Sequence, residues 1–338
     1  MSSGKRIVLA SRPAAEPTVQ NFRLESLDLE QPADGQVELR VLYLSLDPYM
    51  RGRMSDAKSY AKPVPVDGVM QGETICEVTR SRHPEFAAGD LVRAHTGWCT
   101  HAVMKGDAVK HINTFGAPLT TALGVLGMPG FTAYSGMKLI GRPKAGETVA
   151  VAAASGPVGS LVGQLAKLAG ARAVGIAGGP QKCAYVKDAL GFDACLDHRS
   201  GSLAADLAAA CPQGIDVYFE NVGGPIWDLI FPLLNQYSRV PVCGLIAQYS
   251  VVNTEGEDRL PALMSAILRR SILVRGFINY EFAQEHYAAF EQDLGPRVAA
   301  GEIKYREDIV DGLENAPEAF VGMLSGKNFG KLIIRVEG

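Results

Sequence analysis

The stretch Thr148-Val-Ala-Val-Ala-Ala-Ala-Ser-Gly-Pro-Val-Gly159 decides the fold of this chain. Its apolar first half predicts a buried strand at 148–153, and the segment 160–169 after the glycines predicts a helix. Small residues in such a turn let backbone amides approach a ligand, and the helix N-terminus supplies unpaired N–H groups and partial positive charge. We therefore expect a dinucleotide diphosphate to be bound by Gly156, Pro157, Val158 and Gly159.

The sequence after this turn alternates buried strands with helix-length segments, which is typical of right-handed crossovers and a parallel sheet. Strands are predicted at 148–153, 173–177, 194–196, 215–220, 240–243 and 272–277. They predict an α/β fold with a doubly wound, six-stranded parallel (Rossmann) sheet. Ala154 stands where the usual fingerprint has its first glycine, but the strand-turn-helix context favours dinucleotide binding over a merely tight turn.

The segments on either side of this region have a different pattern. Short β-rich runs occur before it, at 22–28, 37–46, 73–79, 90–94 and 100–103, and a further run follows at 331–336 after a helical stretch at 282–300. A length of 338 residues also predicts two domains, at roughly 150 residues per domain. We expect a nucleotide-binding domain at 126–305, inserted between the two parts of a β domain at 1–125 and 306–338.

The composition excludes several classes of protein. With 47% hydrophobic and 20% charged residues, the chain is neither disordered, nor collagen-like, nor a coiled coil. The net charge of -3 gives no broad basic surface, so nucleic acid is not an expected partner. The six cysteines form no Cys-x-x-Cys pair and no His/Cys cluster at zinc spacing, which predicts reduced thiols and no metal site.

No segment has the pattern of an export signal or a membrane span. The apolar run 7–10 stops at Arg12 and is too short for a signal peptide. The uncharged stretch 148–166 is long enough to cross a bilayer, but small and polar residues such as Ser155 and Gln164 interrupt it. A cytoplasmic protein without a membrane partner is therefore expected.

The residues after the second predicted strand indicate which cofactor is bound. NAD is usually held through its ribose by an acidic residue about 20 positions after the glycine turn, and none is present here. The strand leads instead into Ile176-Ala-Gly-Gly-Pro-Gln-Lys182, which leaves room for a 2′-phosphate, so NADP(H) is favoured. Lys182 is the candidate for that phosphate, with a solvated first-turn lysine as the alternative. His198 is a second candidate, nearly as well explained as an ordinary loop histidine.

Five motifs spread along the chain resemble those of one family. They are Leu46-Asp-Pro-Tyr-Met-Arg-Gly52, Leu126-Gly-Met-Pro-Gly-Phe-Thr-Ala-Tyr134, Ala153-Ala-Ser-Gly-Pro-Val-Gly159, Glu220-Asn-Val-Gly-Gly224 and Gly326-Lys-Asn-Phe-Gly330. In this order they resemble the zinc-independent medium-chain reductases, which include leukotriene B4 12-hydroxydehydrogenase/prostaglandin reductase and plant alkenal double-bond reductases. The segments 45–56 and 311–317 are most similar to the bacterial NADPH-dependent curcumin/dihydrocurcumin reductases of that family.

This resemblance implies a Rossmann domain nested in a GroES-like β domain, and a homodimer whose nucleotide-domain sheets join. It implies NADPH-dependent reduction of the carbon–carbon double bond of α,β-unsaturated ketones and aldehydes, with Lys182 and His198 on the adenosine side. The nicotinamide half would be surrounded by Asn221, Cys243, Gly244, Leu245, Ile246, Ala247, Gln248, Tyr249, Phe277, Ile278, Asn279 and Asn328. By composition alone, Asn221 and Asn328 are also explained as turn asparagines.

Zinc-dependent relatives of this family place a histidine before glutamate in a Gly-His-Glu element of the β domain. The matching stretch here is Gln71-Gly72-Glu73, which lacks the histidine. The resemblance therefore implies no metal ligands, and oxidation of an alcohol through a zinc-bound alkoxide loses its Lewis acid. Reduction of an activated alkene does not depend on that Lewis acid.

Two tyrosines are candidates for catalysis. Hydride addition to the β-carbon of an enone puts negative charge on the carbonyl oxygen, and a neutral tyrosine, with an ordinary pKa of about 10, can donate a hydrogen bond to it. Tyr249 follows the fifth predicted strand, at the sheet edge where open α/β folds bind ligands. Tyr49 is expected to close the pocket from the β domain. The alternatives are an interface tyrosine for Tyr249 and a cover over the Asp47-Pro48 turn for Tyr49.

Two other functions stay open at this point. A metal-free, NADP-dependent dehydrogenase of allylic or secondary alcohols would use the same cofactor site. A non-catalytic redox sensor would bind NADPH without oxidising it, and Tyr249 argues only weakly against that function.

Overall fold

The computed structural model describes residues 3–250 and 259–336 of the chain. The chain divides into two compact units, Met1–Gly124 with Glu307–Gly338 and Val125–Arg306. These boundaries differ by one residue from the expected 125/126 and 305/306. The second unit is inserted in the sequence between the two parts of the first.

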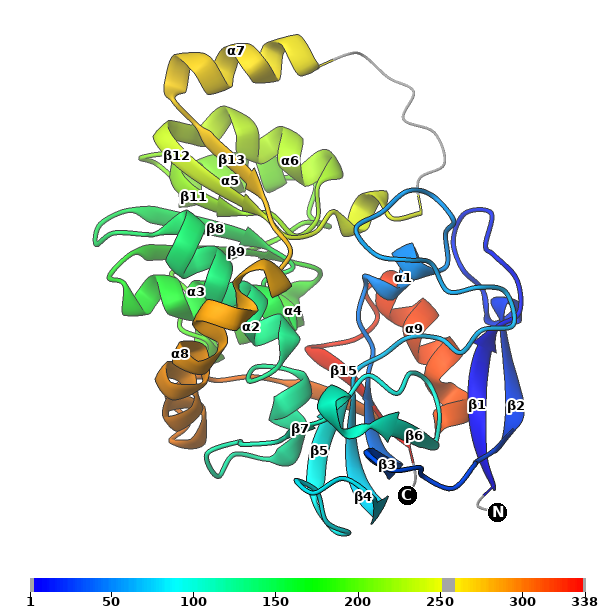
Figure 1. Ribbon diagram of the computed structural model, residues 1–338. Coiled ribbons are helices and arrows are strands. Elements are labelled where there is room, and N and C mark those ends of the chain that lie inside the picture. Colours follow the sequence, from blue (N-terminus) through cyan, green and yellow to red (C-terminus); the bar gives the residue numbers. More distant parts are fainter. Residues whose placement is uncertain (1–2, 251–258, 337–338) are drawn as a thin grey trace. The chain divides into compact units, whose positions relative to one another are not determined.

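The inserted unit is built on a six-stranded sheet (Figure 1). Its strands are β8 (Thr148–Ala152), β9 (Arg172–Ala177), β10 (Ala194–Asp197), β11 (Ile215–Phe219), β12 (Leu234–Val242) and β13 (Leu273–Gly276). Neighbouring strands are parallel, in the order β10-β9-β8-β11-β12-β13. The predicted fold class is confirmed, because the strand order reverses between β8 and β11 as in a doubly wound sheet.

Helices connect these strands, and one further helix precedes the first strand and another follows the last. They are α2 (Met128–Ser135), α3 (Pro157–Leu168), α4 (Pro180–Ala184), α5 (Leu203–Ala210), α6 (Gly224–Ile230), α7 (Leu260–Arg270) and α8 (Tyr280–Ala299). Residues 159–166 of α3 are all buried, which explains why this stretch of sequence carries no charge. Across residues 3–250 and 259–336, no helix has both the length and the apolar character needed to cross a membrane.

The strand predicted at 240–243 is longer than the sequence indicated. In the structure, β12 begins at Leu234. Its first half is mostly polar, and Tyr237 has a left-handed φ of 62°, so an apolar pattern could not reveal it. The pairing of β12 with β11 also shifts register between Ile215 and Val217, which accommodates this irregular segment.

The first unit is mainly antiparallel β structure. Its strands are β1 (Ser3–Leu9), β2 (Phe22–Asp28), β3 (Gln36–Ser45), β4 (Thr74–Ser81), β5 (Leu91–Ala94), β6 (His101–Lys105), β7 (Lys110–His111), β14 (Glu307–Asp311) and β15 (Lys331–Arg335). Its helices are α1 (Met50–Arg53) and α9 (Ala316–Leu324). A ribbon of β1 and β2 accompanies a seven-stranded sheet in which β15 pairs with β3. The sequence did not predict β1, β7 or β14, which are charged or very short.

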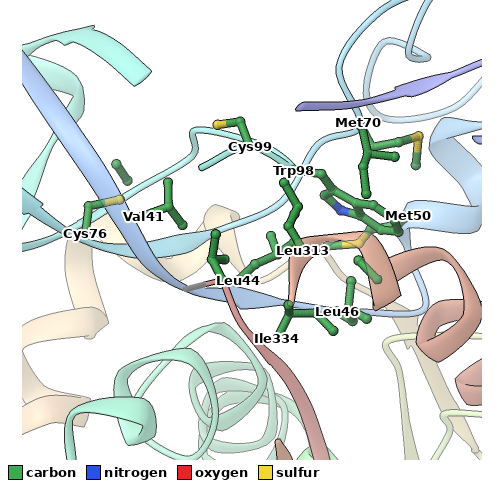
Figure 2. Close-up of a cluster of buried hydrophobic side chains, with 14 of the residues drawn as sticks. Val41, Leu44, Leu46, Met50, Met70, Cys76, Trp98, Cys99, Leu313 and Ile334 are labelled. Carbon is green, nitrogen blue, oxygen red and sulfur yellow. The ribbon is translucent and has the colours of Figure 1, made fainter. Parts of the chain in front are cut away.

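An apolar core fills the first unit. Figure 2 shows Leu44, Met50 and Trp98 packed together in it. Trp98 is fully buried and stacks on Phe22, with ring centroids 5.4 Å apart. Phe320 of α9 meets the Trp98 ring edge-on at 5.7 Å, so α9 closes one side of this core.

We predict that Gly163→Ala destabilises the inserted unit. A Cβ at this position of α3 would lie 1.8 Å from Cζ of Phe192, a ring that is 3% exposed and has little room to move. Overpacking of this kind costs about 1–3 kcal/mol of unfolding free energy, measurable by chemical denaturation. Gly201→Ala is the control, because a Cβ there meets nothing within 4 Å, and it should change stability by less than about 0.5 kcal/mol. Equal stability of the two variants would contradict the packing argument.

Candidate functional site

The turn between β8 and α3 has the geometry of a phosphate cradle. Ala153 takes a left-handed φ of 52°, which turns the chain out of β8. A Cβ on Gly159 would lie 2.5 Å from the Ala153 carbonyl oxygen, so a side chain is excluded there. The first N–H groups of α3 have no partners within the helix and can donate to an anion. The structure brings the four predicted residues to this turn, namely Gly156, Pro157, Val158 and Gly159.

The alanine at the first glycine position is accommodated by the neighbouring strand. Ala154 is fully buried, and its methyl carbon would lie 2.8 Å from a Cβ placed on Gly175 of β9. Because Gly175 has no side chain, β9 leaves the space that this methyl group occupies. The departure from the glycine fingerprint is therefore compensated on the adjacent strand.

Positively charged and imidazole side chains gather at the end of β9. A Cβ on Gly178 would lie 2.8 Å from Nε2 of His198 and 3.2 Å from Nε of Arg199. Burial, followed by the nearby Arg199, lowers the pKa of His198, so its imidazole is mainly neutral at pH 7. Lys182 of α4 adds to this lowering of the pKa. The chemistry of this group suits an anion such as a 2′-phosphate.

Asp197, the acidic residue of this region, is already engaged in hydrogen bonds to the backbone. Oδ1 of Asp197 accepts hydrogen bonds from the backbone N–H groups of Gly179 (2.8 Å) and Arg199 (2.9 Å). These bonds lower the pKa of Asp197. Its carboxylate holds the loop that carries His198 and Arg199.

An open pocket of about 420 Å³ lies at the carboxyl ends of β12 and β13. Its lining residues are Val242, Cys243, Gly244, Leu245, Tyr249, Gly276, Phe277, Ile278 and Glu281. The structure therefore brings together six of the residues predicted around the nicotinamide half: Cys243, Gly244, Leu245, Tyr249, Phe277 and Ile278. The predicted Ile246, Ala247 and Gln248 form a short 3-10 turn, Ile246–Gln248, within the same loop.

A buried carboxylate ties the loops beside this pocket together. Glu220, 2% exposed, accepts hydrogen bonds at Oε1 from the N–H groups of Val222 (2.7 Å) and Gly223 (2.8 Å) and from the Tyr218 hydroxyl (3.2 Å). Its backbone carbonyl accepts a bond from the N–H of Cys243 at 3.1 Å. Burial raises the pKa of the Glu220 carboxyl in spite of these donors. The turn after β11 is thereby fixed to the loop after β12.

Asn221 bridges two strand ends with its side-chain amide. Nδ2 donates to the Ala152 carbonyl at 3.0 Å, and Oδ1 accepts a hydrogen bond from the Cys243 thiol at 2.9 Å. Burial, followed by Glu220, raises the pKa of Cys243, so the thiol stays protonated and able to donate. The structure gives Asn221 a positioning role, and its contact with the nicotinamide ribose stays a prediction.

The Tyr249 hydroxyl turns back toward its own loop. The N–H of Leu245 donates to this hydroxyl oxygen at 3.4 Å. A Cβ on Gly244 would lie 3.1 Å from the same oxygen, so the glycine leaves room for the phenol. Tyr249 thus lines the pocket with its hydroxyl close to the loop after β12.

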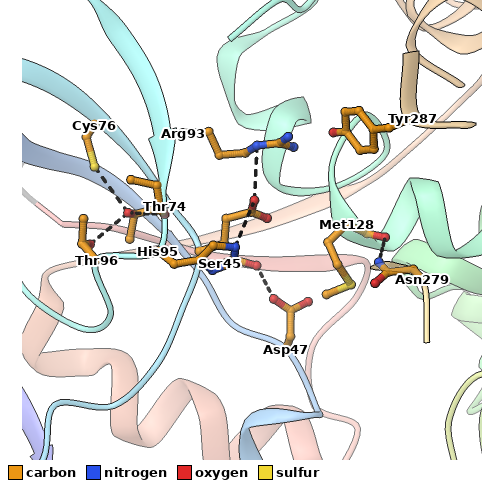
Figure 3. A network of polar contacts seen from close by, with 12 residues as sticks. Ser45, Asp47, Thr74, Cys76, Arg93, His95, Thr96, Met128, Asn279 and Tyr287 are labelled. Carbon is orange, nitrogen blue, oxygen red and sulfur yellow. Dashed lines mark hydrogen bonds and ion pairs between the residues drawn. The ribbon is translucent and has the colours of Figure 1, made fainter. Parts of the chain in front are cut away.

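The two other predicted asparagines shape their own surroundings. Nδ2 of Asn279 donates to Oγ1 of Thr132 (3.1 Å) and to the Met128 carbonyl (3.4 Å; Figure 3), which fixes the start of α8 to α2. Asn328 belongs to the first unit, where Nδ2 donates to the Gly330 carbonyl at 2.8 Å. Their contacts with a cofactor stay predictions.

Tyr49 stands in the first unit at the start of α1. Burial, followed by Asp47 and Glu73, raises its pKa, so the hydroxyl stays neutral and can donate. Each of these two acids has a cationic partner: Lys331 Nζ donates to Asp47 Oδ1 at 2.7 Å, and Arg93 Nε lies 3.2 Å from Glu73 Oε1. The surroundings of Tyr49 therefore carry little uncompensated negative charge.

Packing closes the position where zinc-dependent relatives carry a histidine. A Cβ on Gly72 would lie 2.6 Å from Cδ1 of Leu44 and 3.3 Å from Cε of Met50, both in the core of Figure 2. A histidine would not fit there unless Leu44 moved. In the part of the chain that the structure describes, no group of three His, Cys, Asp or Glu side chains is placed to hold a metal ion.

Sequence reasoning did not select three residues of this region. Arg199 follows His198 directly, and a count of cations after the third strand could have found it. Glu220 ends an apolar strand, where a charged residue needs partners. Glu281 lines the pocket and accepts a hydrogen bond from the N–H of Ile278 at 2.8 Å, and its place in the first turn of a helix was the available signal.

Two family descriptions match the chain: "N-terminal domain of oxidoreductase" over residues 5–112 and "Zinc-binding dehydrogenase" over residues 157–294. The chain is 51% identical over 335 residues to the NADPH-dependent curcumin reductase of Escherichia coli (strain K12), covering 99% of this chain and 97% of that protein. It is 36% identical over 340 residues to the 2-alkenal reductase (NADP(+)-dependent) of Nicotiana tabacum, covering 99% and 98%.

A solved structure agrees with these relatives. The crystal structure of CurA from Vibrio vulnificus in complex with NADPH matches with a TM-score of 0.95 and 51% identity, covering 99% of both chains. Prostaglandin reductase 1 of Bos taurus is 38% identical over 325 residues, covering 94% of this chain and 95% of that protein. The chain therefore belongs to the medium-chain oxidoreductases of the curcumin reductase/prostaglandin reductase type.

Proposed function

We propose that this chain uses NADPH to reduce the carbon–carbon double bond of α,β-unsaturated ketones and aldehydes. The observation that carries the proposal is the pocket at the ends of β12 and β13, where six residues expected around a nicotinamide lie together. Relatives named for curcumin reduction and for 2-alkenal reduction each match 99% of the chain. A small-molecule enone or enal is therefore the proposed substrate.

The inserted unit has features that suit two parts of NADPH, its diphosphate and its 2′-phosphate. The glycine turn before α3 excludes side chains where a diphosphate would approach the backbone. Lys182, His198 and Arg199 would hold the 2′-phosphate at the end of β9. When bound there, NADPH supplies the hydride that the β-carbon of the substrate accepts.

Tyr249 is the proposed donor to the carbonyl oxygen of the substrate. Negative charge develops on this oxygen as the β-carbon accepts a hydride, and a donor already in place stabilises it most strongly where water is excluded. Tyr249 lines the pocket and can donate without carrying a charge. Tyr49 is the second proposed donor, and burial keeps its hydroxyl protonated. The α-carbon would then take its proton from Tyr249 or from water.

A second copy of this chain is the proposed partner. β13 is an edge strand of the six-stranded sheet, and its Leu273 and Val274 are 42% and 41% exposed. The preceding α7 also exposes three large apolar side chains, Leu260, Met264 and Leu268. An exposed apolar edge strand is a template for pairing with another strand. We infer that two β13 edges pair about a two-fold axis in a homodimer.

Tyr249→Phe should reduce enone turnover by on the order of 10²-fold, because it removes the donor to the developing charge. The KM for NADPH should change little. The assay follows NADPH oxidation with enones from acrolein-like aldehydes to curcumin-like diarylketones, and product mass shows whether the alkene or the carbonyl was reduced. Tyr237→Phe, on an exposed tyrosine of β12, is the matched control. Unaltered turnover in Tyr249→Phe would refute the donor role, and NADP-dependent oxidation of an allylic alcohol without alkene reduction would favour the dehydrogenase.

Lys182→Ala should weaken the preference for NADPH over NADH by about 10- to 100-fold, because this factor corresponds to the free energy of one hydrogen bond to a charged group. The measurement is kcat/KM with each cofactor at a fixed enone concentration. Lys187→Ala removes an exposed lysine from the next turn of the same segment and should leave the ratio unchanged. If the ratio is the same in Lys182→Ala and the wild type, the assignment of the phosphate contact is wrong.

Leu273→Glu should weaken the proposed dimer, because it places a charge on the apolar edge. We expect sedimentation equilibrium to show a wild-type species of twice 36.0 kDa and, in the variant, a dissociation constant raised about tenfold or more. Leu24→Glu, on an exposed leucine of β2, is the control. A wild type that stays monomeric at micromolar concentration would rule out this partner.

A further inference from the structure

Among the residues that the structure describes, Arg53 is a buried cation without an acidic partner. The residue is 5% exposed, and its guanidinium makes no ion pair and no hydrogen bond within residues 3–250 and 259–336. The other buried cations of these residues do have acceptors. Arg51 Nη2 donates to the Ala15 carbonyl at 2.7 Å, and Lys331 Nζ donates to Asp47 at 2.7 Å. The donors of Arg53 are therefore available to a ligand.

Two tyrosine rings contact this guanidinium. Cζ of Arg53 lies 4.4 Å from the ring centroid of Tyr60 and 5.4 Å from that of Tyr49. Such cation–π contacts offset part of the cost of burying the charge. These contacts are with the faces of the tyrosine rings, however, and provide no oxygen acceptor for the guanidinium N–H groups.

The loop that carries Tyr60 is closed at its base. The N–H of Val64 donates to the Arg53 carbonyl at 2.8 Å. Arg12 donates to the carbonyls of Met54 (3.0 Å) and Val64 (3.1 Å). These bonds hold the ends of the loop 54–63 together, so the Tyr60 ring is kept beside Arg53 although it is 51% exposed.

The charges around Arg53 favour an anion. The two acids that influence Tyr49, Asp47 and Glu73, are paired with Lys331 and Arg93 as described above, so neither is left to pair with Arg53. The loop 54–63 adds two exposed lysines and a single acid, and that acid, Asp56, lies 4.0 Å from Arg12. An approaching anion therefore meets net positive charge.

We propose that Arg53, Tyr49 and Tyr60 form a subsite for the carboxylate of a planar conjugated substrate. This inference rests on the proposed function, because Tyr49 is there a donor to the reacting end of the substrate. A carboxylate matches the donor fork of one guanidinium with two parallel hydrogen bonds, and the tyrosine rings suit a flat π system beside it. A phosphate dianion would exceed the charge of one guanidinium, and a phenol is neutral at pH 7.

The first test compares benzylideneacetone with its para-carboxy derivative in the reductase assay. In Arg53→Met, we expect kcat/KM for the carboxylated enone to fall at least tenfold more than kcat/KM for the neutral one. Arg53→Lys keeps the positive charge but cannot form two parallel hydrogen bonds to a carboxylate. It should therefore lose part of the preference for the carboxylated enone. Arg82→Met removes an exposed arginine of the same unit and should leave the preference unchanged. A preference that is the same in the wild type and in both Arg53 variants would overturn the proposal.

The second test measures binding without turnover. Calorimetric titration with cinnamate should show binding to the wild type that is at least tenfold weaker in Arg53→Met, whereas the neutral cinnamamide should bind both proteins alike. If Arg53→Met does not fold, as judged by its melting curve, the comparison with Arg53→Lys decides. Failure of the wild type to bind cinnamate would overturn the subsite even if enones are reduced. Failure to reduce any enone would overturn the proposed function, while the titration would still report on Arg53.

Discussion

The buried carboxylate of Glu220 is the interaction on which the cofactor end of the sheet depends. A parallel sheet brings the carboxyl ends of β11 and β12 together, but it does not fix the loops that follow them. Glu220 does so, because Oε1 takes the N–H groups of Val222 and Gly223 while its backbone carbonyl takes that of Cys243. Each of these N–H groups would cost about 1–3 kcal/mol if it were buried without an acceptor. The raised pKa of Glu220 shows that this arrangement is held against the cost of burying a charge.

In the same region, small side chains and the hydrogen-bonded side-chain amide of Asn221 together shape the cofactor site. Gly159 and Gly175 remove side chains where β8, α3 and β9 approach one another, and the methyl group of Ala154 fills the space that Gly175 leaves. Asn221 then bridges the ends of β8 and β12 through its two hydrogen bonds. A cofactor therefore meets backbone whose position is set before it binds, so less conformational entropy is lost on binding.

Local sequence patterns predicted the features that depend on neighbouring residues. The run from Thr148 to Gly159 contains the strand, the turn and the helix start in order, so the sheet and the phosphate turn could be predicted. The first half of β12 could not, because a register shift and a left-handed Tyr237 break its pattern. The sequence also could not predict which side chains contact one another. Nothing in the sequence placed Tyr60 on Arg53, because that contact depends on the closure of a loop.

The ionisable groups proposed to meet the cofactor phosphate differ in kind from those proposed to meet the reacting substrate, and the difference follows from the charge that each is proposed to meet. Lys182 and Arg199 lie at the end of β9, where a phosphate would bring a permanent negative charge that a cation can pair with. Tyr249 and Tyr49 are the proposed donors to a charge that exists only during the reaction. A neutral hydroxyl costs less to keep in a dry pocket than an ion does when no substrate is present. Neutral donors at the reacting end and cations at the anionic ends are therefore the arrangement with the smallest desolvation cost.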